Sequence, residues 1–208
     1  MADNSLKKRI LEISYKNKLS HLGSYFSSVD IVDNIYSQMK EDDIFILSCG
    51  HASLALYVCN EKYFGINAED IFNKHGGHPH HNEEDKIHCS TGSLGLGITI
   101  GVGRAIANKE RIVHVLISDG ECAEGSVWES LKTIKEQSIS NIVIHVNING
   151  YAAYMEVDQQ YLVERLKAFL PEIKIHYTDV ECLPFLKGLN AHYHVMSENN
   201  YKEALLLL

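Results

Sequence analysis

Two short apolar segments with an amphipathic segment between them constrain the fold of this chain more than any other feature. Residues Ile112 to Ser118 and Asn141 to Val146 are nearly continuous apolar runs, which predicts strands buried on both faces. Between them, Trp128 to Lys135 belongs to a segment with apolar residues at helical spacing. This order of strand, helix and strand predicts an α/β fold in which a parallel sheet is flanked by helices on both faces.

Polar residues follow each predicted strand. Asp119 and Gly120 come directly after the first strand, and Asn147 and Asn149 come at the end of the second. Because ligands of open α/β sheets bind outside the carboxyl ends of the strands, we expect Asp119 and Asn149 to converge there. Carboxylate and amide oxygens suit Mg²⁺, although Asp-Gly after a strand is also a common turn. The pair therefore predicts either a magnesium site that holds a diphosphate or an ordinary loop.

Four motifs in a fixed order favour the magnesium site. Ser118 to Glu129, with the later Asn149, resembles the Gly-Asp-Gly-Glu, Glu-Gly-x-x-Trp-Glu and Asp-x-Asn elements of the thiamine-diphosphate-binding module of transketolases. Upstream, Ser20 to Ile31 resembles the His-x-Gly segment of that family, Leu47 to Tyr57 its Ser-x-Gly-His segment, and Ser90 to Gly97 its Gly-rich helix start. The resemblance implies the thiamine-diphosphate-binding fold of that module.

The resemblance also implies roles for single residues around the metal. Asp119 and Asn149 match the side-chain ligands of the magnesium ion, and the main-chain carbonyl of Tyr151 is expected as a third protein ligand. Gly120 matches the glycine whose backbone faces the diphosphate, and Glu124 matches a carboxylate at the contact between subunits.

Histidines are the predicted catalytic groups. The resemblance places His51 beside the diphosphate, and it places His21 and His78 in the substrate channel, where they assist proton transfer to and from the sugar. The family has one more histidine near the end of this domain, and His192 and His194 are alternatives for it. The residues expected to bind the cofactor are His51, Gly92, Leu94, Gly120, Glu121, Asn149, His192 and His194.

The chain departs from the family pattern at several positions. Ser118 replaces the first glycine of the Gly-Asp-Gly motif, Asn147 replaces an aspartate, and Cys49 stands where many relatives have lysine. After about Met155 the chain is shorter than relatives usually are, with the next strand and helix compressed into residues 167–189. We expect residues 1–208 to form one domain that is shortened after about residue 155.

Other candidate residues fit simpler roles. The run from His75 to His81 is rich in histidine, but its glycines and proline indicate a loop rather than a zinc site. Gly95 to Ala107 predicts a small-residue helix that packs closely against a second copy or a partner subunit. The five cysteines show no Cys-x-x-Cys spacing, which predicts reduced thiols in a cytoplasmic protein. Six further histidines are expected to be surface or hydrogen-bonded residues, namely His80, His81, His88, His114, His145 and His176.

Charge and hydropathy disfavour several classes of partner. The formal net charge of −8 disfavours binding to nucleic acid or to acidic membranes, since phosphate groups attract basic surfaces. No apolar run approaches the ~20 residues that a bilayer span requires, and the charged segment Asp3 to Arg9 does not have the form of a signal peptide.

Amphipathic helices are predicted at Leu6 to Tyr15 and at Ser28 to Met39, the second with Asp30 in its first turn.

The resemblance implies a transketolase that depends on thiamine diphosphate and Mg²⁺ and transfers a two-carbon ketol unit from a ketose to an aldose, with specialised sugar biosynthesis as one pathway. In that family a glutamate on a pyrimidine-binding module activates the cofactor, and no room for that module remains after Leu208. We therefore expect a separate pyrimidine-binding subunit, an α2β2 heterotetramer, sugar or sugar-phosphate substrates, and no activity of the chain alone. The alternatives are the diphosphate-binding subunit of a 2-oxoacid decarboxylase or dehydrogenase, and a non-catalytic transketolase-like partner.

Overall fold

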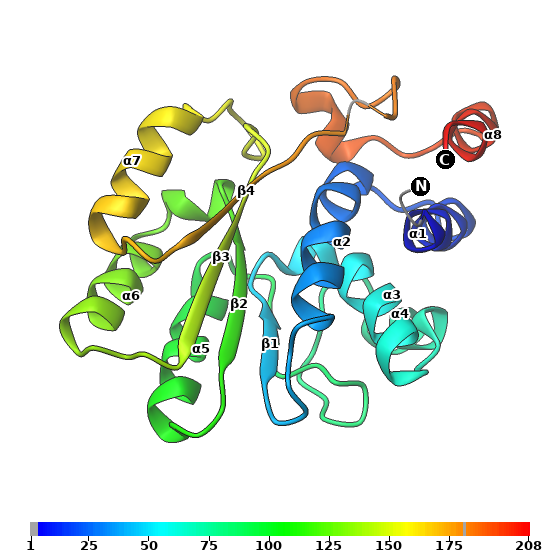
Figure 1. The fold of residues 1–208 in the computed structure, drawn as a ribbon. Coiled ribbons are helices and arrows are strands. Elements are labelled where there is room, and N and C mark those ends of the chain that lie inside the picture. Colours follow the sequence, from blue (N-terminus) through cyan, green and yellow to red (C-terminus); the bar gives the residue numbers. More distant parts are fainter. Residues whose placement is uncertain (1–3, 181) are drawn as a thin grey trace.

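The computed structural model describes residues 4–180 and 182–208, and the centre of the fold is a parallel sheet. The strands lie side by side in chain order, and all neighbouring pairs are parallel (Figure 1). They are β1 (Ile44–Leu47), β2 (Val113–Ser118), β3 (Ile142–Ile148) and β4 (Lys174–Tyr177). The two strands predicted from the apolar runs are confirmed as β2 and β3, and β3 extends two residues beyond its predicted end.

Helices cover both faces of the sheet, as the sequence predicts (Figure 1). One side carries α5 (Leu96–Ala107), α6 (Gly125–Glu136) and α7 (Gln159–Phe169). The other side carries α1 (Ser5–Lys16), α2 (Leu22–Tyr36), α3 (Ser53–Phe64), α4 (Ala68–His75) and α8 (Glu198–Leu207). Short 3-10 helices lie at η1 (Gly50–Ala52), η2 (Gly120–Ala123) and η3 (Leu189–Tyr193).

The apolar side chains of the strands point alternately to the two faces of the sheet and so belong to two separate cores. In β2, Val113, Val115 and Ile117 belong to the core beneath α5, α6 and α7, whereas Leu116 belongs to the core beneath α2 and α3. Successive side chains of a strand point to opposite faces, so a strand covered on both sides needs apolar residues at most positions. This is why β2 and β3 are nearly continuous apolar runs in the sequence.

The face of the sheet towards α2 is polar where β3 and β4 approach that helix. Asn147 of β3 donates hydrogen bonds through Nδ2 to the hydroxyls of Ser27 and Ser28 on α2, at 3.0 and 3.2 Å. Its Oδ1 atom accepts a hydrogen bond of 2.5 Å from the hydroxyl of Thr178. An amide donates and accepts in this way, while an ionised aspartate only accepts. Asn147, which replaces the aspartate of the family pattern, therefore fits the hydroxyl groups around it.

A row of three histidines crosses the same face of the sheet, one from each of β2, β3 and β4. His114 Nδ1 lies 3.3 Å from His145 Nε2, and His145 Nδ1 lies 3.0 Å from His176 Nε2, which are hydrogen-bonding distances. Burial lowers the pKa of all three imidazoles, and that of the central His145 to about 3. We call these residues the histidine row. They are hydrogen-bonded to one another, and they lie in strands rather than in the predicted site.

For the helix predicted at Ser28 to Met39, both predicted ends are wrong. The helix is α2, which starts at Leu22, because Tyr25 already belongs to its buried apolar face. Asp30, which suggested a first turn, lies in the middle of α2 and forms a salt bridge of 2.6 Å with Lys7 of α1. The other predicted amphipathic helix is confirmed as α1, which is one residue longer at each end.

The glycines in the centre of α5 serve its packing on the chain's own sheet. A Cβ atom at Gly97 would lie 2.6 Å from Ser48, and one at Gly101 would lie 2.5 Å from Val115. Both distances are shorter than real Cβ contacts, so larger residues would displace α5 from the sheet. The small-residue face that the sequence predicted for contact with another subunit is thus used, at these two glycines, within the chain.

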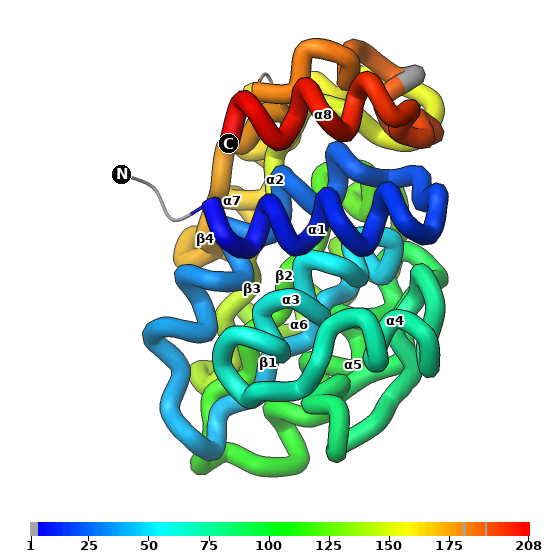
Figure 2. The backbone as a smooth tube through the Cα atoms, turned by 90° about the vertical axis from the view of Figure 1, so that its right-hand side faces the viewer, coloured from blue at the N-terminus to red at the C-terminus, as the bar shows by residue number. Residues whose placement is uncertain are grey.

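The first and last helices lie next to each other on the side of α2 and α3. The rings of Tyr15 in α1 and Tyr201 in α8 stack with centroids 4.4 Å apart, and Figure 2 shows the two helices side by side. In the part of the chain that the structure describes, no helix combines the length and the apolar character needed to span a bilayer.

Candidate functional site

Polar strand ends and the start of a helix converge at the carboxyl edge of the sheet. Asp119 follows the last residue of β2, and Asn149 follows the last residue of β3. The start of α2 contacts η3, a segment far away in the sequence (upper part of Figure 1). Since η1, which carries His51, follows β1 at the same edge of the sheet and also contacts α2, the elements that carry the predicted metal and histidine residues meet in one region of the fold.

The carboxylate of Asp119 is almost completely buried, with 3% exposed, and main-chain N–H groups hold it. Oδ2 accepts hydrogen bonds from Asn149 at 2.9 Å and from Gly150 at 2.7 Å, and Oδ1 accepts one from Gly120 at 2.9 Å. Burial raises the pKa of Asp119 to about 6, against the lowering effect of these hydrogen bonds. The two strand ends that the sequence predicted to converge are joined directly.

Asn149 and Tyr151 continue this edge into a hairpin. The Oδ1 atom of Asn149 accepts a hydrogen bond of 2.9 Å from the N–H group of Tyr151, and Tyr151 pairs with Glu156 across the hairpin. No group of three or more His, Cys, Asp or Glu side chains in residues 4–180 and 182–208 is arranged to hold a metal ion. The donors at this edge are one carboxylate with amide and carbonyl oxygens. That set suits Mg²⁺, which takes further ligands from phosphate and water.

The packing of the chain does not require a glycine at position 120. A Cβ atom there would meet the Cα atom of Ala152 at 3.4 Å, which is an ordinary contact. Unlike the central glycines of α5, Gly120 therefore has no neighbour among the described residues that excludes a side chain. A bare backbone at this place agrees with the role that the resemblance implies, in which Gly120 faces the diphosphate.

Glu121 lies beneath the edge rather than on it. Its side chain is completely buried. Oε1 accepts hydrogen bonds from the Ser48 hydroxyl at 2.7 Å and the Gly95 N–H at 2.9 Å, and Oε2 accepts one from the Ser118 N–H at 3.0 Å. Burial raises its pKa. Predicted as a cofactor-binding residue, Glu121 joins the ends of β1 and β2 to the start of α5, so its effect on a ligand would be indirect.

Histidine rings from distant parts of the chain form a cluster at the start of α2. The ring centroids of His21 and His192 are 4.4 Å apart, and that of His51 is 5.7 Å from each. The N–H group of His21 also donates a hydrogen bond of 3.0 Å to the carbonyl of His192. His78 is close enough for its charge to act on His21 and His51. We call these four residues the histidine cluster.

Burial keeps two of these imidazoles neutral. Burial, with a smaller effect of the neighbouring histidines, lowers the pKa of His51 to about 3 and that of His21 to about 4. The Nδ1 atom of His21 is buried and has no hydrogen-bond partner among the described residues. His21 and His51 are therefore unprotonated near neutral pH, and their nitrogen atoms can accept a proton from a hydroxyl group.

The structure distinguishes the two histidines that the sequence left as alternatives. His192 belongs to the histidine cluster, whereas Nε2 of His194 is hydrogen-bonded to Asn200 at 3.0 Å and its ring lies beside Phe185. Because η3 ends between them, at Tyr193, the two side chains have different neighbours. Of the two, His192 is placed with the other predicted site residues.

The loop before α5 packs against the histidine cluster. A Cβ atom at Gly92 would lie 3.2 Å from the ring of His78. Gly50, which precedes His51, lies so close to Thr91 that a Cβ atom would come within 2.8 Å of its backbone. Leu94 in the same loop is 36% exposed. The predicted cofactor residue Gly92 thus lies next to the predicted catalytic residue His78, and Leu94 follows two residues later in the same loop.

Glu124 is exposed and directly precedes α6, and it lies close to Gly95, the residue before α5, a helix with an exposed apolar face. On that face Leu96, Ile100 and Ile106 are 48%, 40% and 47% exposed, at helical spacing. Exposed apolar side chains that lie together on one helix form a surface suited to contact with another protein. We call Leu96, Ile100, Ile106 and Glu124 the α5 surface.

Sequence reasoning missed several residues that shape the site. Tyr193 packs against His192 with ring centroids 4.7 Å apart, and its place between two candidate histidines was an available signal. Ser27 and Ser28 gave no such signal, because their role depends on hydrogen bonds to Asn147, more than a hundred residues away.

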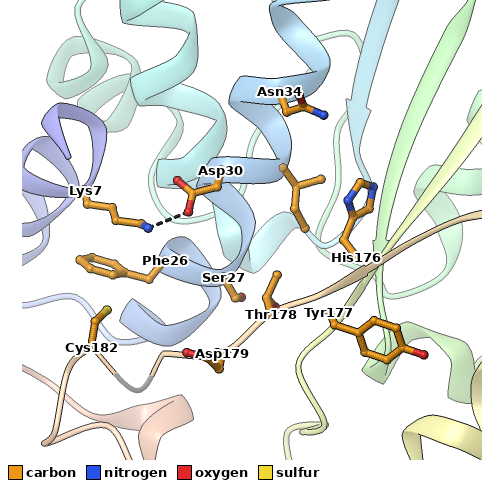
Figure 3. Close-up of a pocket in the computed structure, with 11 residues that line it drawn as sticks. Lys7, Phe26, Ser27, Asp30, Asn34, His176, Tyr177, Thr178, Asp179 and Cys182 are labelled. Carbon is orange, nitrogen blue, oxygen red and sulfur yellow. Dashed lines mark hydrogen bonds and ion pairs between the residues drawn. The ribbon is translucent and has the colours of Figure 1, made fainter. Parts of the chain in front are cut away.

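A cavity of about 480 Å³ lies elsewhere, between α2 and β4 (Figure 3). Its lining includes the salt bridge between Lys7 and Asp30, as well as His176 and Thr178, but none of the predicted site residues. It is therefore separate from the edge that carries Asp119 and from the histidine cluster.

Known proteins share this sequence pattern. The family model described as "Transketolase, thiamine diphosphate binding domain" matches residues 16–169. An apulose-4-phosphate transketolase subunit of Phocaeicola vulgatus is 34% identical over 163 residues, which cover 69% of this chain and 58% of that protein. The 6-deoxy-6-sulfo-D-fructose transketolase subunit SqwG of Clostridium sp. (strain MSTE9) is 28% identical over 166 residues, which cover 70% of this chain and 60% of that protein.

A solved structure shares the fold. The transketolase of Campylobacter jejuni superposes with a TM-score of 0.78 over 97% of this chain and 41% of that chain, at 18% sequence identity. The chain spans 58% and 60% of the length of the two curated relatives. Since the family model matches the greater part of the sequence, the chain belongs to the thiamine-diphosphate-binding domain family of transketolases.

Proposed function

We propose that this chain is the diphosphate-binding part of a transketolase that transfers a two-carbon ketol unit from a ketose to an aldose. One observation carries the proposal: the joined strand ends at Asp119 and Asn149 lie at the edge of the fold that also carries the histidine cluster. The transketolase subunits among the relatives support the same activity. Thiamine diphosphate, when bound, supplies the electron sink that cleavage of a ketose carbon–carbon bond needs.

Asp119, Asn149 and the carbonyl of Tyr151 would hold Mg²⁺, and the backbone of Gly120 would face the diphosphate. The surroundings of the buried Asp119 carboxylate support this assignment. The groups that set its pKa are its buried surroundings and main-chain N–H groups, and no lysine or arginine of the described chain is among them. A buried carboxylate without a cationic neighbour is costly, and a bound cation would balance its charge.

The histidine cluster would move protons at the sugar. His21 and His51 are neutral, so either can accept the proton of a sugar hydroxyl when the carbon–carbon bond breaks and return it after the new bond forms. His192 holds the main chain of His21 through its carbonyl, which fixes the position of that ring. His78 is more exposed, and we assign to it a hydrogen bond to an oxygen atom of the sugar.

A second subunit would complete the enzyme. We propose that it carries the pyrimidine-binding module, and that two copies of each chain form an α2β2 assembly. Both curated relatives are named as subunits, which supports a partner. The α5 surface offers exposed apolar side chains beside Glu124, the residue that the family resemblance places at a subunit contact.

The test uses this chain together with its pyrimidine-binding subunit and measures cofactor binding and catalysis separately. Asp119→Ala is expected to abolish Mg²⁺-dependent binding of thiamine diphosphate in titration calorimetry. Asp70→Ala is the matched control, because Asp70 is an exposed aspartate on α4, away from the edge. Ketol transfer from xylulose 5-phosphate to ribose 5-phosphate is followed by mass spectrometry in the same samples.

Each alternative has its own outcome in this experiment. Unchanged cofactor affinity of Asp119→Ala would refute the metal site. Conversion of pyruvate with no turnover of sugars would favour a subunit of a 2-oxoacid decarboxylase. Cofactor binding without turnover of either substrate would favour the non-catalytic partner.

A further inference from the structure

Two tyrosines from opposite sides of the candidate site meet beside the histidine cluster. Tyr154 lies in the hairpin that follows Asn149, and Tyr193 is the last residue of η3, directly after His192. A side-chain hydrogen bond to Tyr154 raises the pKa of Tyr193. Since the hairpin starts at the predicted metal residues and η3 carries a histidine of the cluster, this tyrosine pair connects the two halves of the site.

Tyr193 forms a layer directly outside the histidines. Its ring meets that of His192 edge-on, with centroids 4.7 Å apart and an interplanar angle of 80°, and its centroid lies 6.0 Å from that of His21. Even so, 54% of Tyr193 and 84% of Tyr154 remain exposed. Large aromatic side chains that stay exposed next to a functional centre are available for contact with a ligand.

Main-chain hydrogen bonds connect the two segments that carry the tyrosine pair, the hairpin and η3, to the site. The N–H group of Gly150, at the base of the hairpin, donates to Asp119 at 2.7 Å. The N–H group of Val157 donates to the carbonyl of Gly150 at 2.9 Å, which closes the hairpin that carries Tyr154. On the other side, η3 is held by the hydrogen bond from His21 to its main chain. The two backbone segments that carry the tyrosines are therefore held by contacts with residues of the site.

The surroundings of the pair suit a sugar chain rather than a phosphate group. The ring contacts of Tyr193 are with His21 and His192, and the charges that act most on His21 and His51 are those of other histidines. Phosphate recognition depends on cationic or clustered N–H donors. Aromatic faces instead pack on carbon-bound hydrogens, and phenol groups donate to and accept from hydroxyl groups.

We infer that Tyr154 and Tyr193 are specificity-determining residues that bind the carbon chain and hydroxyl groups of the sugar substrate, and not its phosphate group. The inference rests on the proposed ketol transfer at the same site. It assigns substrate contacts to two residues outside the motifs that define the family resemblance. Any phosphate of the substrate would then be bound by groups that this pair does not provide.

The experiment compares two acceptors in the complete enzyme, ribose 5-phosphate and ribose. Tyr154→Ala and Tyr193→Ala are each expected to lower kcat/KM about 10-fold, a typical effect of one lost binding contact, mainly through a higher KM. The factor is expected to be the same for both acceptors, because the lost contact is not with phosphate. Tyr161→Ala is the matched control, since Tyr161 is 56% exposed but lies on α7, and it is expected to change neither constant.

Three results would overturn the inference. The first is an unchanged kcat/KM in both variants, and the second is a loss confined to ribose 5-phosphate. The third is loss of cofactor affinity or of binding to the partner subunit, measured by calorimetry, because the tyrosines would then serve assembly. If the wild-type enzyme transfers no ketol unit to either acceptor, the proposed function itself fails, a result that is distinct from a failure of the two variants.

Discussion

At the scale of single residues, two kinds of glycine predict opposite results on substitution. Gly120→Ala is expected to change the free energy of unfolding by less than about 0.5 kcal/mol, because the new Cβ atom would make only an ordinary contact with Ala152. The same change is expected to weaken binding of thiamine diphosphate at least about 10-fold by crowding the backbone that faces the diphosphate. Urea unfolding and titration calorimetry measure the two effects.

Gly101→Ala is the matched comparison. Its Cβ atom would lie 2.5 Å from Val115, so we expect a loss of about 1–3 kcal/mol in the free energy of unfolding. If Gly120→Ala destabilised the fold as much as Gly101→Ala, the view that Gly120 serves a ligand rather than the fold would be wrong.

The residues that sequence reasoning could locate are those whose position follows from a local rule. Asp119 and Asn149 each follow a buried strand, and the carboxyl ends of parallel strands meet at one edge. The choice between His192 and His194 had no such rule, because it depends on contacts with His21 across the fold. The burial of Glu121 was equally hidden, since its hydrogen-bond partners come from three separate segments.

At the scale of elements, the histidine row makes the stability of the sheet depend on pH. The pKa of His145 is about 3 in the folded chain, against an ordinary value of 6.5. As the pH falls below about 6.5, the unfolded chain takes up a proton that folded His145 does not, so stability is lost between pH 6.5 and about 3. For one such group the loss is about 1.4 kcal/mol per pH unit.

Urea unfolding at several pH values between 7.5 and 5 tests this expectation. His145→Leu removes the buried imidazole, so its free energy of unfolding is expected to depend less steeply on pH than that of the wild type. Some dependence will remain, because the low pKa values of His21 and His51 act in the same direction. His80→Leu, at an exposed loop position, is the control. Equal slopes for the wild type and His145→Leu would contradict the role of the row.

Elements differed in how well the sequence predicted them. β2 and β3 were predictable because burial on both faces requires continuous apolar runs, and the sequence displays such runs directly. The start of α2 was not predictable. The residue before it, His21, has a left-handed backbone conformation with φ of +65° and makes no side-chain capping hydrogen bond. Helix starts are read from capping residues, and His21 is not one of the usual types.

At the scale of the whole molecule, the α5 surface predicts how the chain associates. Ile100→Asp is expected to leave the fold intact, because Ile100 is 40% exposed, and to weaken binding to the partner subunit or a second copy at least about 10-fold by placing a charge in an apolar contact. Sedimentation velocity of the mixed subunits measures the change. Leu206→Asp on α8 is the control, since Leu206 is 88% exposed and lies on a different helix. Equal association of both variants and the wild type would show that the α5 surface is not an interface.

The hydrogen bond from Gly150 to Asp119 has a consequence for the chemical ageing of the protein. Asn-Gly sequences deamidate readily, because the nitrogen after the asparagine can attack the side-chain amide when no bulky residue shields it. In Asn149-Gly150 that nitrogen is held by the Asp119 carboxylate at 2.7 Å, and the amide oxygen accepts from Tyr151. The fold thus restrains a reaction that would convert a predicted metal ligand into a second carboxylate. Stored protein should keep Asn149 intact only while this edge stays folded.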